Sequence, residues 1–510
     1  MSLKRGSNLA GTQRYLLHPL LFGIYPILYQ WVLNISEIST KHVFRPLVVS
    51  LFAVVLLLLI FHLIYHDWTK AALVTTILLI LFYSYGHVYI AFKEITLGEV
   101  YPFRHRTLVP VWVAAACFVM WQMFRKKGNL ASLTSIFNAA GLFLLIMPTY
   151  QLVAYPFEAR ISESNNKKNM QMLALQADGD MPDIYYIILD GYGRSDILKD
   201  TYGYDNSEFL SSLKGLGFYV VDCSQSNYAQ TEFSLVSSLN YNYLDELGNQ
   251  LISETIDRPA LDSLIKHSAL RQDLEGVGYK TVAFATGFDW TELDDADYYL
   301  SPESSFAKLN EFERLLITTT FARILQNASL DDQYADPELY RERTLFTLDK
   351  LDKLAYIKGP KFVFVHLIVP HPPYVFGPTG ETVDPVAVDA PRAERIRYRD
   401  QAIYISSRMQ EIVPKIIANS ITPPIIIIQG DHGPTVPSSP QQRMSNLSVY
   451  YLPGVDAHLQ PRLTPVNTFR VILNAYFGQN LEMLDDLSLY SSYDDPVNFK
   501  TIRNTCNTDK

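Results

Sequence analysis

Residues 424–433 read PIIIIQGDHG, and this stretch decides how the second half of the chain is expected to fold. Its four consecutive isoleucines form an unbroken apolar run, which is typical of a strand buried on both faces of a parallel sheet. Similar short runs occur at 183–190, 280–286 and 361–369. Helical patterns alternate with them, so the sequence predicts an α/β sandwich, a largely parallel central sheet with helices on both faces. The expected helices span 209–216, 261–277, 391–418 and 466–477.

Polar residues stand at the ends of two of these strands. Asp190 closes the first run, and Asp431 and His432 close the last. Functional side chains of open parallel sheets gather beyond the carboxyl ends of the strands. Two carboxylates and a histidine suit a divalent metal held by oxygen and nitrogen ligands. Taken singly, each residue has a structural alternative: Asp190 could cap a turn, Asp431 could be a helix N-cap, and His432 could be a core histidine. Against this, Gly430 and Gly433 permit a tight backbone around the Asp-His pair.

The first 155 residues differ in composition from the rest of the 510-residue chain. They hold 12 Lys and Arg against 4 Asp and Glu, a net charge of +8, whereas the remainder holds 31 against 48, a net charge of −17. A basic, apolar first part before an acidic, mixed second part indicates a membrane anchor followed by a soluble domain. The composition therefore argues against a purely soluble enzyme and against a nucleic-acid partner.

Five long apolar runs lie within this first part, and each reaches the length of about 18–20 residues that crosses a bilayer. With the N-terminus taken as cytoplasmic, the inside loops carry seven basic residues and the outside loops five. This bias places the second half outside the cytoplasmic membrane. The alternative, buried helices of a large soluble protein, is disfavoured by five such runs in succession. The predicted spans are 15–34, 46–65, 71–92, 107–124 and 132–155, followed by a polar juxtamembrane linker at 156–180 and one soluble domain at 181–510.

Cysteines are sparse. Cys117 falls in an apolar run, which leaves Cys223 and Cys506 as the one pair available to the soluble part. Unpaired thiols remain the alternative, since three cysteines form no disulfide framework.

The order of these motifs resembles the alkaline phosphatase superfamily, specifically its sulfatase-like branch. The resemblance rests on a strand ending in Asp190-Gly191, a threonine at a helix start in 227–239 (NYAQTEFSLVSSL), PHPPY at 370–374, and a strand ending in GDHG at 430–433. The motifs cover about residues 183–480. With five apolar runs in front, the whole chain resembles the lipoteichoic acid synthases and the phosphoethanolamine transferases.

This resemblance implies a role for several residues. Asp190, Asp431 and His432 would bind a divalent metal, Thr231 would be the nucleophile and also contact the metal, and His371 would contact the substrate phosphate or the leaving group. The two-metal members carry a further His before the last helix, which the stretch LTPVNTFRVILNAYFG lacks, so we expect one ion, zinc or manganese. The synthases carry Glu where Asp190 stands, so the match there is to the wider superfamily.

A threonine hydroxyl is a poor nucleophile until metal coordination lowers its pKa. The stretch after Thr231 reads as a helix start, whose backbone amides can bind phosphate oxygens. The alternative reading is a helix N-cap, but Ser234 stands where a capping box needs Glu or Gln. The Pro and Arg of the C/S-x-P-x-R pattern of arylsulfatases are absent after Thr231, which favours phosphoryl over sulfuryl chemistry.

Four further residues are candidates for substrate binding. Arg194 and Asn227 could reach phosphate oxygens, with a solvated helix start as the alternative for Arg194. Asp289 and Trp290 could contact a substrate alcohol or amine, and a surface loop with a packed aromatic is the alternative there. We expect His366, inside a strand, to be structural.

The sequence thus predicts a membrane-anchored, metal-dependent phosphotransferase or phosphodiesterase with a phospho-threonine intermediate. It would move a phospholipid-derived head group to a cell-envelope glycan or lipid. Two alternatives are a sulfatase-like hydrolase with water as acceptor and a non-catalytic envelope protein that keeps the fold. Anchoring favours a lipid-bound donor or acceptor, because it raises the effective concentration.

Overall fold

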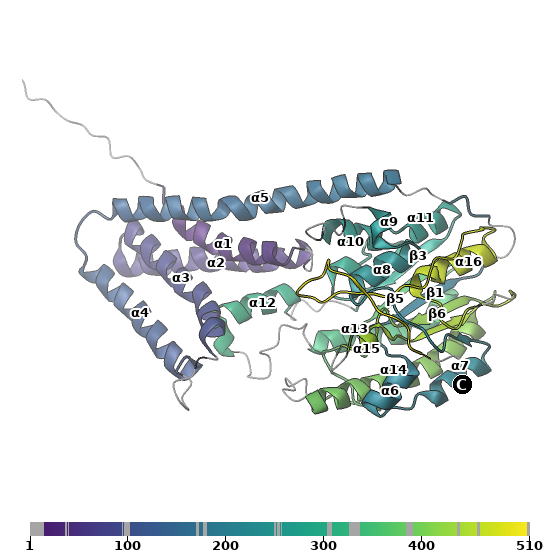
Figure 1. Cartoon of the computed structure of the whole chain (residues 1–510). Helices are drawn as coiled ribbons and strands as arrows, with labels where there is room; N and C mark the ends of the chain where they lie inside the picture. Colours follow the sequence, from purple (N-terminus) through teal and green to yellow (C-terminus); the bar gives the residue numbers. More distant parts are fainter. Residues whose placement is uncertain are drawn as a thin grey trace, which may run out of the picture. The chain divides into compact units, whose positions relative to one another are not determined.

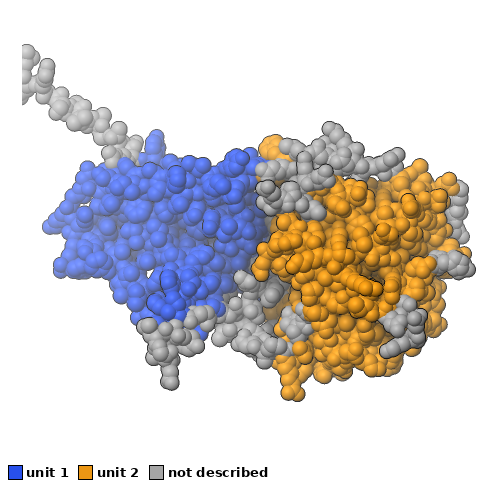
Figure 2. All heavy atoms as spheres, viewed as in Figure 1, with its two compact units in different colours: residues 1–154, 309–328 blue, residues 155–308, 329–510 orange. Residues whose placement is uncertain are grey.

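The chain forms two compact units in the computed structural model (Figure 2). Unit 1 comprises residues 1–154 and 309–328, and unit 2 comprises residues 155–308 and 329–510. The first division falls at the composition boundary. Segment 309–328, which the sequence predicts as part of the soluble domain, belongs to unit 1. The structure describes residues 15–35, 38, 40–93, 95, 102–169, 173–176, 181–248, 251, 256, 258–302, 309–325, 337–383, 391–435, 439–455 and 459–506.

Each of the five predicted apolar runs lies in a helix (Figure 1). Four described helices are long and apolar enough to cross a membrane, whereas α1, at 16 residues, is shorter. The fifth helix continues beyond the predicted span into the segment that the sequence reading treated as a linker. The five are α1 (His18–Leu33), α2 (Thr40–Tyr65), α3 (Trp68–Phe92), α4 (His105–Arg125) and α5 (Ala131–Asn169).

Small and polar residues join the first three helices of unit 1. A Cβ at Gly23 of α1 would lie 2.6 Å from Val54 of α2, so these helices approach as closely as small residues allow. The Ser50 hydroxyl on α2 donates to the Gly23 carbonyl at 2.8 Å and contacts the Tyr83 hydroxyl of α3 at 2.8 Å. His18 Nδ1 lies 2.6 Å from Thr76 Oγ1.

The segment that returns to unit 1 consists of α12 (Glu311–Thr319) and the 3-10 helix η2 (Phe321–Leu325). Asn310 and Glu313 form a capping box that starts α12. Phe312 and Leu316 pack in one apolar cluster with residues of α1 and α2. At nine residues, α12 is too short to give a membrane signal in the sequence.

The central sheet of unit 2 has seven described strands in the order β2-β7-β6-β1-β5-β3-β4. Strands β6, β1, β5, β3 and β4 run parallel, and β7 is antiparallel to β6 and to β2. The largely parallel sheet predicted from the apolar runs is confirmed. The strands are β1 (Ile184–Leu189), β2 (Tyr219–Val220), β3 (Lys280–Phe284), β4 (Tyr298–Leu300), β5 (Lys361–Leu367), β6 (Ile425–Gln429) and β7 (Ser448–Tyr451), and β8 (Leu489–Tyr490) pairs with β9 (Lys500–Thr501).

Helices cover both faces of this sheet (Figure 1). Alternate residues of β1 point to opposite cores, with Ile187 in one and Tyr186 in the other, as the strand period of two requires. The first core includes α6 (Ser195–Tyr202), α7 (Ser207–Gly215), α13 (Pro337–Lys350), the 3-10 helix η4 (Leu351–Tyr356) and α14 (Pro391–Asn419). The second includes α8 (Thr231–Leu239), α9 (Leu244–Leu247), α10 (Arg258–Lys266), α11 (Ala269–Gly276), the 3-10 helices η1 (Asp289–Thr291) and η5 (Pro465–Asn467), and α16 (Thr468–Tyr476).

The helix expected at 261–277 is interrupted in the structure. It is divided into α10 and α11, because Ser268 accepts a hydrogen bond from the Arg271 amide and begins a new helix. Between β6 and β7 lies the short helix α15 (Pro440–Met444), capped by Ser439 and Gln442.

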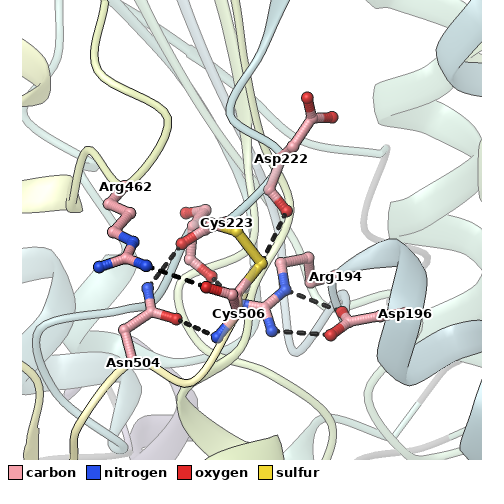
Figure 3. Close-up of a disulfide and its surroundings, with 8 residues drawn as sticks. Arg194, Asp196, Asp222, Cys223, Arg462, Asn504 and Cys506 are labelled. Carbon is pink, nitrogen blue, oxygen red and sulfur yellow. Dashed lines mark hydrogen bonds and ion pairs between the residues drawn. A yellow bond between two sulfur atoms is a disulfide. The ribbon is translucent and has the colours of Figure 1, made fainter. Parts of the chain in front are cut away.

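Cys223 and Cys506 form a disulfide in unit 2 (Figure 3). It ties the C-terminal segment to the loop before α8 across 283 residues of sequence. Asn504 Nδ2 donates to the Cys223 carbonyl at 2.8 Å, and Arg462 donates to the Cys506 carbonyl at 3.0 Å. Cys117 is exposed and unpaired.

Candidate metal centre

Three neighbouring parallel strands bring the strand-end residues together. The central strand β1 is flanked by β5 and β6, so the carboxyl ends of all three lie at one edge of the sheet. Asp190 follows β1, and Asp431 and His432 follow β6. This is the arrangement in which parallel sheets build functional sites.

Asp190, Asp431 and His432 form what we call the Asp–Asp–His cluster. Each offers one ligand atom, and these atoms lie within 4.8 Å of one another. His432 Nε2 lies 3.2 Å from Asp431 Oδ2 and 3.7 Å from Asp190 Oδ1. All three residues are buried.

Two of the carboxylate oxygens in this cluster are buried without a hydrogen-bond partner among the described residues. They are Asp190 Oδ1 and Asp431 Oδ2. Buried acceptors of this kind are costly, and two adjacent carboxylates repel each other unless a cation lies between them. The donor set, two carboxylates and an imidazole, fits a divalent metal ion such as zinc or manganese.

His432 has its lone pair directed into the cluster. Its Nδ1 lies 2.8 Å from the Gly433 carbonyl, which can only accept, so Nδ1 carries the proton and Nε2 is free of one. A carbonyl that fixes the imidazole tautomer in this way is typical behind metal-binding histidines. Burial, and then the charge of Arg443, lowers the pKa of His432 well below its ordinary value. The imidazole is therefore neutral, as metal coordination requires.

The two carboxyl groups have opposite pKa shifts. Burial raises the pKa of Asp190, but the charges of neighbouring histidines, His371 foremost, outweigh this and lower it overall. Burial and the charge of Asp190 raise the pKa of Asp431 to about 6. Asp190 therefore stays ionised, and Asp431 holds its proton until the pH rises above about 6 or a cation displaces it.

Thr231 contacts the cluster as the first residue of α8. Its Oγ1 lies 3.1 Å from His432 Nε2, and it is only partly buried, unlike the three cluster residues. Gln230, at the N-cap, makes no capping hydrogen bond through its side chain. The first-turn amides of a helix have no intrahelical acceptor, so this helix start can bind an anion next to the Thr231 hydroxyl.

Two histidines neighbour the cluster, one inside β5 and one in the segment that follows it. His366, the second-last residue of β5, has its Nε2 3.3 Å from Asp190 Oδ2, and neither ring nitrogen has a hydrogen-bond partner among the described residues. His371 Nδ1 lies 2.8 Å from the Pro372 carbonyl, so Nε2 is the ring nitrogen left for a substrate. His366, predicted to be structural, thus lies against Asp190.

The glycines around Asp431 and His432 are required by close approach. A Cβ at Gly433 would lie 2.2 Å from the Gln442 carbonyl oxygen, and one at Gly430 would lie 2.5 Å from the Tyr192 carbonyl oxygen. Larger residues would displace the turn that presents the Asp-His pair. The Gly191 amide also donates to Asp431 Oδ1 at 2.9 Å and fixes the carboxylate.

Arg194 and Asn227 are engaged in structural hydrogen bonds. Arg194 donates to both Asp196 oxygens at 2.8 Å (Figure 3). It also donates to the Ser224 carbonyl at 2.9 Å. The Asn227 amide donates to Tyr243, Thr464 and the Leu487 carbonyl, and its oxygen accepts from the Val466 amide. The structure brings neither side chain to the Asp–Asp–His cluster, because each is already saturated with protein partners.

Trp290 is buried in the second core, and its ring centroid lies 5.8 Å from that of His366. It therefore packs behind the histidine that contacts Asp190. Asp289 begins η1, and its side chain lies outside the described residues.

Arg443 is a member of the site that the sequence did not suggest. Its Nη2 donates to His432 Nε2 at 2.9 Å and to the Tyr493 hydroxyl at 3.2 Å, and its Nε donates to the Ala229 carbonyl at 2.9 Å. This buried guanidinium therefore donates to the Nε2 lone pair that would bind a metal, so a bound ion would have to displace this hydrogen bond. Nothing in the local sequence of α15 marks it, since only the fold brings it to the strand end.

No family model and no curated protein matches the chain. Several solved structures do. The integral membrane protein lipooligosaccharide phosphoethanolamine transferase A from Neisseria meningitidis has 12% identity and a TM-score of 0.39, covering 90% of this chain and 94% of that chain. The chain is similar to phosphoethanolamine transferases.

Two further solved structures are similar to the chain at comparable identity and TM-score. The zinc complex of the periplasmic domain of EcEptC from Escherichia coli has 14% identity and a TM-score of 0.38, over 61% of this chain and 87% of that one. A protein of the alkaline phosphatase superfamily from Vibrio parahaemolyticus has 11% identity and a TM-score of 0.36, over 66% and 81%.

Proposed function

We propose that this chain is a membrane-anchored, metal-dependent phosphotransferase of the sulfatase-like type, with Thr231 as nucleophile. The observation that carries the proposal is the Thr231 hydroxyl 3.1 Å from His432 Nε2, partly exposed beside the buried Asp–Asp–His cluster. A nucleophile, a set of metal ligands and a helix N-terminus for phosphate oxygens meet at this point.

Asp190, Asp431, His432 and the Thr231 hydroxyl would hold one divalent ion. When bound, the ion supplies positive charge that lowers the pKa of the Thr231 hydroxyl and neutralises charge on the phosphoryl group. The Gly191 amide and the Gly433 carbonyl fix the orientations of Asp431 and His432 as this requires.

The chemistry of the chain's own residues follows from this arrangement. Thr231 loses its proton to solvent and its Oγ1 attacks the phosphorus of a phospholipid head group, so that the Oγ1–P bond forms and the bond to the diacylglycerol oxygen breaks. The amides of the first turn of α8 bind the non-bridging oxygens. His371 gives a proton to the departing diacylglycerol oxygen, because its Nδ1 is held by Pro372 and its Nε2 can exchange one.

The second half-reaction restores the enzyme. An acceptor hydroxyl, on an envelope glycan or lipid, attacks the phosphorus of the phospho-threonine, and the Oγ1–P bond breaks. His371, which gave up its proton in the first step, takes the proton of the acceptor hydroxyl, and Thr231 Oγ1 regains a proton from solvent. In a hydrolase, water would take the place of this acceptor.

The membrane and the disulfide indicate where the reaction takes place. Four described helices are long and apolar enough to span a membrane. The Cys223–Cys506 disulfide lies in unit 2, and disulfides persist in oxidising compartments. The disulfide supports the proposal that unit 2 faces the extracytoplasmic side of the cell membrane, where a lipid donor is confined to the same layer as the anchor.

The test uses the full chain in vesicles that contain phospholipid with a labelled head-group phosphate, loaded with zinc or manganese. We expect diacylglycerol and label on an added glycan or lipid acceptor, and neither product with Thr231→Ala. Label that appears only as free phosphoryl head group would make the protein a hydrolase. Turnover that survives Thr231→Ala would refute the nucleophile.

A further inference from the structure

Unit 1 contains a cavity of about 340 Å³ among α1, α3 and α12. This volume lies in the range of roughly 300–1,000 Å³ that small-molecule sites occupy. Every residue that lines it belongs to unit 1, and none belongs to the Asp–Asp–His cluster. The cavity is therefore a candidate binding site in addition to the metal centre.

The cavity has an apolar end and a polar end. α1 and α3 run in the same direction, because His18 meets Thr76 and Gly23 is joined through Ser50 to Tyr83. The lining residues nearer the N-terminal ends of both helices are apolar. Those nearer the C-terminal ends are polar. The apolar set is Phe22, Leu79 and Ile80, and the polar set is Tyr29, Gln30 and His87.

Gln30 places a buried side-chain amide at the polar end of the cavity. Its side chain is only 7% exposed, and no hydrogen bond of its amide group occurs among the described residues; its backbone carbonyl accepts from Asn34. Gln30 lines the cavity, and polar side chains inside a membrane helix bundle mark binding sites. A ligand with hydrogen-bonding oxygens at this level would accept hydrogen bonds from the Gln30 amide.

The segment α12 covers the polar end. Thr319 and Leu316 line the cavity, and a Cβ at Gly86 of α3 would lie 2.3 Å from the Thr319 carbonyl carbon. Glu313 forms an ion pair with Arg45 of α2, and Asn310 Nδ2 donates to the His42 carbonyl at 3.0 Å. This helix is joined in sequence to unit 2 on both sides, so chain from outside the five-helix region completes the cavity.

We propose that this cavity binds one membrane glycerophospholipid. One acyl chain lies along Phe22, Leu79 and Ile80, and the ester carbonyls accept hydrogen bonds from Gln30 and the hydroxyls near it. The described lining residues include no Lys, Arg, Asp or Glu, so recognition rests on the ester region and not on head-group charge. The inference does not depend on the proposed phosphotransfer.

The experiment uses the purified full chain and a phosphatidylcholine that carries a photoreactive group on one acyl chain. After irradiation, mass spectrometry locates the cross-linked peptides. We expect label concentrated in residues 22–30, 79–87 and 316–319, and displaced by unlabelled phosphatidylcholine and by phosphatidylglycerol alike. Label spread evenly over the exposed surfaces of α2 and α5 would overturn the proposal.

Two variants and two controls sharpen the test. Ser84→Phe fills the cavity and should lower labelling about tenfold, which corresponds to about 1.4 kcal/mol. Gln30→Leu keeps the volume, removes the amide and should also lower labelling. Leu56→Phe, on an exposed part of α2, should leave it unchanged, and so should Thr231→Ala. Equal labelling of Ser84→Phe, Gln30→Leu and Leu56→Phe would refute the site whatever the outcome for phosphotransfer.

Discussion

Thr231 Oγ1 lies 3.1 Å from His432 Nε2, although 201 positions separate the two residues in the chain. One begins a helix on a face of the sheet, and the other follows the strand β6. Their contact joins an uncapped helix N-terminus to two buried carboxylates. This contact places the proposed nucleophile directly beside the proposed metal ligands.

Replacement of Thr231 by Ala should lower phosphotransfer by about three orders of magnitude or more, the scale of losses when a nucleophile is removed. Thr231→Ser keeps a hydroxyl and should retain part of the rate. Elemental analysis should still find metal in both variants at saturating metal, because the three ligands of the Asp–Asp–His cluster remain. An Ala variant as active as the Ser variant would exclude Thr231 as nucleophile.

Asp431→Asn and His432→Ala should each weaken binding of zinc or manganese by more than about a hundredfold, since each removes a ligand. Isothermal titration calorimetry on the metal-free protein measures this directly. Asp196→Asn is the matched control, because its carboxylate pairs with Arg194 away from the cluster. Wild-type affinity in either ligand variant would mean that the cluster holds no metal.

Acid should weaken metal binding. Burial next to Asp190 raises the pKa of Asp431 to about 6 in the metal-free protein. Above that pH the carboxylate is free for a metal, and below it a proton competes, so affinity should fall up to about tenfold per pH unit below 6. Titrations between pH 5 and 8 test this, and Asp431→Asn should lose that dependence. An affinity independent of pH in the wild type would contradict the shift.

Cys223→Ser should destabilise unit 2 by about 2–4 kcal/mol, because the disulfide with Cys506 closes a long loop. A lower melting temperature in circular dichroism would show the effect, and reduction of the wild type should reproduce it. Cys117→Ser should have no effect, since Cys117 is exposed and unpaired. Equal melting of all three would show that the disulfide adds nothing to stability.

Gly433→Ala should cost about 1–3 kcal/mol, because its Cβ would meet the Gln442 carbonyl oxygen at 2.2 Å. It should also weaken metal binding, since the same turn presents Asp431 and His432. Gly215→Ala, at the end of α7, is the control, because a Cβ there meets nothing within 4 Å. The two variants should differ clearly in thermal melting and in metal titration.

The sequence could predict the sheet and the membrane helices because their signals are local. Runs such as 425–428 are uniformly apolar, which fits a strand buried on both faces, and the apolar helices are long enough to stand out. The break at Ser268 escaped prediction because the apolar period continues through it, and only the cap shows that the helix restarts.

The candidate site was partly predictable because Asp190, Asp431 and His432 stand at strand ends, which parallel topology brings together. Arg443 and His366 could not be assigned in this way. Arg443 acts from α15 across a turn, and His366 looks like a core residue until its neighbour Asp190 is placed beside it. The return of α12 to unit 1 was likewise invisible, since it depends on contacts 268 residues apart such as Asn310 with His42.

The most direct test of the central claim is intact mass spectrometry of metal-loaded protein, quenched in acid after incubation with phospholipid in the absence of an acceptor. The account predicts an adduct of one phosphoryl head group that peptide mapping places on Thr231, absent from Thr231→Ala. An adduct on another residue, or turnover of the lipid with no adduct at Thr231 at any time point, would contradict it.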